Sequence, residues 1–99
     1  MLEERLEQDM KTALKAGEQT RLSTLRMMRS QILLEKKKST TKPTLSDDEV
    51  VAVLGAYAKK LRESAAEYAK LGRPDEAGKI KDELAQWKKI AADHKIVAE

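Results

Sequence analysis

"LGRPDEAGKIKDELAQWKKIAADH" (residues 71–94) contains the clearest indication of the fold. It begins as a turn, because glycine is favoured just beyond a helix end and proline is tolerated at the first position of the next helix. Apolar residues then recur at steps of three and four: Ala77, Ile80, Leu84, Trp87 and Ala91. This spacing is typical of a helix that buries one face. The stretch therefore predicts a tight turn that joins two antiparallel helices.

The same rules predict further helices upstream, the first of which ends at Gly17. The four predicted helices span about 2–16, 19–38, 46–71 and 74–95. The first two, like the last two, are separated by only a short turn. We therefore predict an all-α, four-helix domain made of two antiparallel hairpins, with residues 1–99 as a single domain.

The segment SDDE (46–49) predicts how the third helix begins. The Ser46 hydroxyl can accept a hydrogen bond from the Glu49 backbone N–H, and the Glu49 side chain can reach back to the Ser46 N–H. This capping box explains the neighbouring acids as helix-terminal residues and not as a catalytic pair. The preceding segment KKKSTTKP (36–43) is predicted to be an exposed loop.

The composition excludes several classes of protein. The chain has no cysteine, which rules out a disulfide scaffold, a zinc knuckle and a thiol nucleophile. It has no apolar run approaching the roughly 18 residues of a membrane span. A single histidine and no glycine-rich phosphate loop give no basis for a metal or cofactor. We expect a cytoplasmic protein without membrane contact, and without catalytic activity of its own.

Some side chains can be placed in advance. Counting outward from the first turn puts Asp9 level with Arg26, so we predict an ion pair between them. Trp87 is expected in the core, and His94, close to the C-terminus, is expected to be exposed.

The second predicted helix (19–38) contains the stretch RLSTLRMMRSQILLEKKK (21–38), which carries apolar residues on several faces. This is typical of a helix packed between neighbours. It also carries Arg21, Arg26, Arg29, Lys36, Lys37 and Lys38, and Lys42 follows in the loop. These cations are candidates for contact with nucleic-acid phosphates. The alternative is that the arginines pair with neighbouring carboxylates while the lysines are merely solvated.

Three stretches resemble the GatB/YqeY family, specifically the N-terminal helical part of YqeY-like proteins. They are LEERLEQDMKTALKAGEQTRLSTLRMMRSQI (2–32), LSDDEVVAVL (45–54) and KKLRESAAEYAKLGRPDEAGKIKDEL (59–84). The family's second small helical domain follows a Tyr-Leu-Pro segment. Because Ile90-Ala91-Ala92 stands at that place, we expect that domain to be absent.

The resemblance implies a relation to the tail of the B subunit of the tRNA-dependent amidotransferase. It therefore implies tRNA, an aminoacyl-tRNA synthetase or an amidotransferase subunit as partners. By family label alone it implies a carbon–nitrogen ligase with glutamine as amido-N-donor. The basic positions that match the family are Arg21, Arg26, Arg62 and Arg73.

We therefore predict a non-catalytic accessory module that associates with tRNA. The alternative is a protein–protein interaction module without nucleic-acid binding, and the sequence leaves the oligomeric state open. Solvent-facing Arg21, Arg29 and Lys36 would favour RNA, whereas exposed Met27 and Leu34 would favour a protein partner.

Overall fold

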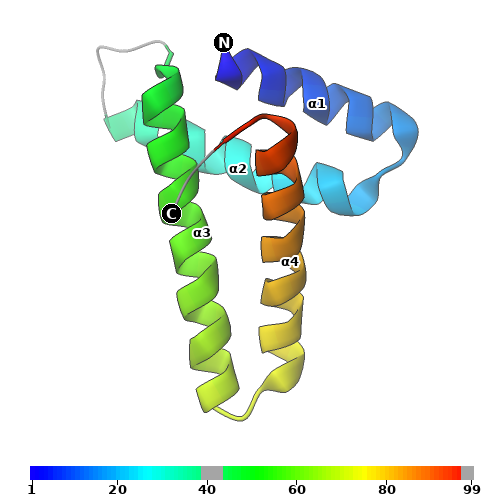
Figure 1. The fold of residues 1–99 in the computed structure, drawn as a ribbon, viewed down its shortest axis with the longest axis vertical. Helices are drawn as coiled ribbons and strands as arrows, with labels where there is room; N and C mark the ends of the chain where they lie inside the picture. Colours follow the sequence, from blue (N-terminus) through cyan, green and yellow to red (C-terminus); the bar gives the residue numbers. More distant parts are fainter. Residues whose placement is uncertain (39–43, 97–99) are drawn as a thin grey trace.

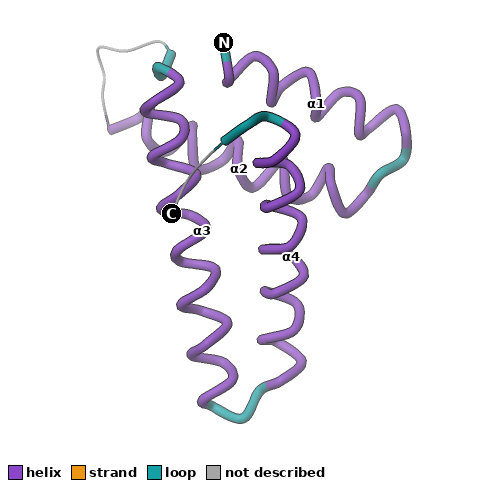
Figure 2. Tube along the Cα trace, viewed as in Figure 1, coloured by secondary structure: helices purple, strands orange, loops and turns teal. Residues whose placement is uncertain are grey.

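The computed structural model describes residues 1–38 and 44–96, and the described part of the chain is built from four α-helices (Figure 1). They are α1 (Leu2–Ala16), α2 (Gln19–Lys38), α3 (Asp47–Lys70) and α4 (Pro74–Asp93). Figure 2 shows that only short connections interrupt the helices in these ranges. The predicted all-α class is confirmed, and each boundary lies within two residues of its expected position.

The helices end and begin where local chemistry predicts. Gly17 and Gly72 both have φ of 72°, the left-handed conformation that glycine adopts without steric cost. At the start of α3, the Glu49 N–H donates to the Ser46 Oγ at 3.2 Å and the Ser46 N–H donates to the Glu49 Oε1 at 2.9 Å. The predicted capping box is therefore present, and it fixes the point at which α3 begins.

The two hairpins cross each other. α1 and α2 run antiparallel, and α2 lies across the halves of α3 and α4 that are remote from their connecting turn (Figure 1). The other halves of α3 and α4 project beyond this crossing. The radius of gyration is 14.1 Å, against about 13 Å for a compact domain of this length. The projecting hairpin accounts for the difference.

The core lies where the hairpins cross, with α2 at its centre. Leu25 and Met28 of α2 are each 1% exposed, and Leu54 of α3 and Ile90 of α4 are fully buried. α2 contacts all three other helices, which explains why its apolar residues are spread around its circumference. Trp87 is buried in the same cluster, as expected.

Two hydrogen bonds join the N-terminus of α1 to the start of α3. The Leu2 N–H donates to the Asp47 Oδ1 at 2.8 Å, and the Leu45 N–H donates to the Glu3 Oε2 at 3.3 Å. The two carboxylates thus accept hydrogen bonds from backbone N–H groups at the start of α1 and just before α3. N–H groups at a helix start have no carbonyl acceptor within their own helix. The contact sets the position of α1 relative to the second hairpin.

Candidate functional site

The exposed side of α2 is the most unusual surface of the described residues. We call it the α2 outer face. Its exposed residues are Gln19, Thr20, Ser23, Arg26, Met27, Arg29, Ser30, Leu33, Leu34, Lys37 and Lys38. At about 100° per residue they cover one contiguous half of the helix. None of them is acidic, so the face combines apolar, basic and uncharged polar side chains.

Three of the candidate cations turn toward neighbouring elements. The Arg21 Nη2 lies 2.6 Å from the Asp9 Oδ2 and 2.8 Å from the Asp93 Oδ2. The Arg29 Nε lies 2.9 Å from the Glu7 Oε1. A cation that is already paired must lose that partner, or share it, before it can neutralise a phosphate. Arg21 and Arg29 are therefore structural ion-pair partners in this conformation.

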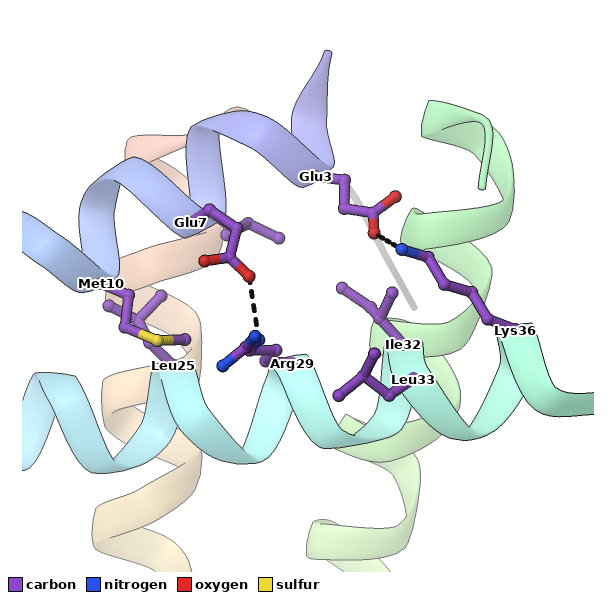
Figure 3. A pocket seen from close by; sticks show the side chains of 9 residues that line it. Glu3, Glu7, Met10, Leu25, Arg29, Ile32, Leu33 and Lys36 are labelled. Carbon is purple, nitrogen blue, oxygen red and sulfur yellow. Dashed lines mark ion pairs between the residues drawn. The ribbon is translucent and has the colours of Figure 1, made fainter. Parts of the chain in front are cut away.

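Lys36 is the third of these cations, and with Arg29 it spans a groove between α1 and α2 (Figure 3). Ion pairs Glu7–Arg29 and Glu3–Lys36 join the two helices across this groove. Its apolar lining comes from Leu6, Met10, Leu25, Ile32 and Leu33. Its volume is about 130 Å³, below the roughly 300 Å³ at which ligand pockets begin. The groove therefore acts as part of the α1–α2 packing.

Asp9 pairs with Arg21 and not with Arg26, so the predicted Asp9–Arg26 ion pair was wrong. The Arg21 Nε donates to the Asp9 Oδ1 at 2.9 Å in a two-pronged contact, whereas Arg26 is exposed. Counting residues from the turn predicts how far along each helix a residue lies, but it does not predict the direction in which its side chain points. Rotation about α2 points Arg26 away from α1, while the long Arg21 side chain reaches back toward it. The hydrogen bonds from Arg21, with help from His94, hold the pKa of the Asp9 carboxyl below its ordinary value against the opposing effect of burial.

His94 is also not the exposed residue that was expected. Its Nε2 lies 2.7 Å from the Asp9 Oδ2, and its side chain is only 12% exposed. The cause is the end of α4, where Lys95 adopts φ of 56° and the Ile96 N–H donates to the Ala91 carbonyl at 2.8 Å. This Schellman motif turns Ile96 into the core and brings His94 against α1. The glycine that usually marks the motif is absent, and an apolar residue at Ile96 is the signal that could have indicated it.

The remaining candidate cations are not gathered in one patch. Arg26, Lys37 and Lys38 are exposed on the α2 outer face and form no ion pair within the part of the chain described. Arg62 is exposed on α3, and Arg73 lies at the far turn of the second hairpin (Figure 1). Lys42 lies outside the described residues.

Apolar side chains are exposed between these free cations. Met27 is 42% exposed and Leu34 is 53% exposed, and their separation of seven residues places them on one side of α2. Leu33, at the edge of the α1–α2 groove, is 44% exposed. Three large apolar side chains on one helix face form a patch of the kind that marks interaction sites.

The described residues hold little else that could perform chemistry. They contain no group of three or more metal-ligating side chains, and none of their helices is long and apolar enough to cross a membrane. The Tyr57 hydroxyl donates to the Glu83 Oε2 between α3 and α4. Burial is the main cause that raises the pKa of Tyr57 above its ordinary value, and this hydrogen bond is the second cause. The hydroxyl therefore stays protonated.

The crossed hairpins and the α2 outer face together define a small all-α module with an exposed apolar and basic helix face. A family model described as Yqey-like protein matches residues 3–89. The match covers most of the chain, so the chain belongs to the YqeY-like family. Comparison with curated proteins found no match.

Proposed function

We propose that this protein is a non-catalytic accessory module that docks onto a protein partner through the α2 outer face. The observation that carries the proposal is the exposure of Met27 and Leu34 on the same side of α2. Burying such side chains at an interface is favourable, at roughly 25 cal/mol per Å² of apolar surface. An aminoacyl-tRNA synthetase or an amidotransferase subunit is the kind of partner that the family resemblance suggests.

The ion pairs of α2 support a protein partner over RNA. Arg21, Arg29 and Lys36 are candidate phosphate ligands, and each is paired with a carboxylate of α1 or α4. Recruiting them for RNA would break contacts that join the helices. The free cations would instead act at the rim of an interface, where charge guides association and orientation.

Association with tRNA is the second candidate function. It is favoured by the free cations Arg26, Lys37 and Lys38 and by a net charge of +3. Contacts of this kind would position the protein on phosphates without reading the base sequence.

A photo-reactive residue introduced at position 34 tests the protein-partner proposal. Crosslinking in cell extract should produce a discrete protein adduct. The matched control places the same group at position 71, because Leu71 is 62% exposed but lies at the far turn of the second hairpin. Equal adducts at both positions, or none at position 34, would remove the proposal.

The RNA candidate is tested by fluorescence anisotropy with total tRNA at about 50 and 200 mM salt. Affinity that falls steeply with salt and weakens in the triple variant Arg26→Gln, Lys37→Gln, Lys38→Gln would support it. The amidotransferase label is checked separately, by assaying the purified protein for release of ammonia from glutamine.

A further inference from the structure

We propose that the α2 outer face accepts an amphipathic helix of the partner protein, with apolar residues along its contact line and acidic residues flanking them. This inference rests on the proposed function and specifies the chemistry of the partner. It is carried by two properties of the face: the spacing of its small and large side chains and its complete lack of acidic residues.

The spacing fits a helix lying along α2. Ser23, Met27, Ser30 and Leu34 are separated by four, three and four residues, which is the repeat that lets two helices pack side chains into each other's gaps. All four are exposed. The two serine side chains are smaller than Met27 and Leu34, so this alternation of small and large residues suits interdigitation with a second helix. At about 1.5 Å per residue, the line is roughly 16 Å long, which corresponds to about three turns of a partner helix.

The charges favour an acidic occupant. Arg26 stands near one end of the contact line, and Lys37 and Lys38 stand near the other. None of the three has an ion-pair partner within the described residues. Acidic residues at the edges of a docked helix would lie beside these cations and would suppress binding of basic competitors.

Other occupants fit this face less well. A second copy of the chain packing α2 against α2 would offer Arg26, Lys37 and Lys38 no acidic partner, because the α2 outer face itself has no acidic residue. A bilayer surface would need a continuous apolar face to insert, whereas two of the four positions on the contact line are serines.

Two synthetic helical peptides test the inference. Both carry leucine at the a and d positions of three heptads, and they differ only in having glutamate or lysine at the e and g positions. Binding to the full chain is measured by fluorescence anisotropy, with tRNA and anionic lipid vesicles as separate probes. The acidic peptide should bind about tenfold more tightly than the basic peptide. About three ion pairs can form between its glutamates and the cations of the α2 outer face, and exposed ion pairs each contribute modestly.

Variants locate the binding site. The double variant Met27→Ser, Leu34→Ser should no longer bind the acidic peptide, whereas Leu71→Ser should bind it as the parent protein does. The variant Arg26→Gln, Lys37→Gln, Lys38→Gln keeps the apolar line and should lose most of the preference for the acidic peptide. A helical circular dichroism spectrum like that of the parent protein establishes that each variant is folded.

Equal affinity for both peptides, or unchanged binding by the Met27→Ser, Leu34→Ser variant, would overturn the inference. Preferential binding of vesicles or tRNA at this face would also overturn it. A protein adduct at position 34 together with equal peptide affinities would contradict only the acidic-helix inference and would leave the proposed function intact. No adduct at position 34 together with equal peptide affinities would contradict both the proposed function and the inference.

Discussion

The carboxylate of Asp9 accepts a hydrogen bond from the Nε2–H of His94 at 2.7 Å, although 85 residues separate them in the chain. The same carboxylate accepts two hydrogen bonds from Arg21. One side chain of α1 thus holds both the start of α2 and the end of α4. Together with the apolar core and the hydrogen bonds between α1 and the start of α3, this cluster joins the first hairpin to the second.

Replacing Asp9 should therefore destabilise the fold. Asp9→Asn leaves the Arg21 guanidinium with only the exposed Asp93 carboxylate and removes the charged acceptor of His94. We expect a loss of about 1–3 kcal/mol in the free energy of unfolding. Urea denaturation measures it, with Glu63→Gln on the exposed side of α3 as the matched control. Equal denaturation midpoints for the two variants would contradict the prediction.

The Asp9 cluster should also make stability depend on pH in the acid range. The folded-state pKa of Asp9 lies below its ordinary value of 3.8, so the folded protein binds this proton more weakly than the unfolded chain does. The stability that the ionised Asp9 carboxylate contributes is complete above the pKa of the unfolded chain. It is lost as the pH falls through the lower pKa of the folded protein. The stability difference between the parent and Asp9→Asn should therefore shrink as the pH falls below 3.8. A difference that grew as the pH fell below 3.8 would show the opposite linkage.

Two adjacent methionines give a direct test of the α2 outer face. Met28 is 1% exposed and Met27 is 42% exposed. Met28→Ala should cost about 2–5 kcal/mol, because it leaves a cavity in the core. Met27→Ala should cost less than about 1 kcal/mol, because solvent already covers much of that side chain. Thermal and urea unfolding of both variants measure the difference. Similar losses would mean that Met27 is buried in solution.

Tyr57 should resist ionisation. Burial and the hydrogen bond to Glu83 raise the pKa of Tyr57 above the ordinary value of 10.0. The stability contributed by the protonated hydroxyl is therefore complete below pH 10.0 and is lost as the pH rises through the folded-state pKa. Ultraviolet titration of tyrosinate should contain a component that forms only well above pH 10.0. Tyr57→Phe should remove this component, and Tyr68→Phe should retain it. A titration of the parent protein that is complete near the ordinary value would refute the assignment.

The helices were predictable because their signals are local. Gly17, Ser46 with Glu49, and Pro74 each act within a few residues, through backbone conformation or a capping hydrogen bond. The apolar periodicity of α3 and α4 needs only the geometry of a single helix. The hairpin order followed from the short turns between helices.

The ion pairs were not predictable to the same degree. The sequence placed Asp9 level with Arg26, but it could not say which side chains of α2 rotate toward α1. It also marked the turn at the end of α4 only weakly, because Lys95 stands where a glycine usually does and the apolar Ile96 is the one remaining signal. The sequence therefore did not separate paired cations such as Arg21 from free cations such as Lys37.

The sequence by itself determined the four helices, their order and their buried stripes, because these depend on backbone propensity, capping and periodicity within short segments. Only the tertiary structure decided which cations are available and which apolar side chains stay exposed. Those outcomes depend on the crossing of the two hairpins and on the rotation of α2 between them. Packing of α2 against α1 pairs Arg21, Arg29 and Lys36 with acids of α1, and the crossing adds Asp93 of α4 to Arg21. The same arrangement leaves Met27 and Leu34 facing solvent.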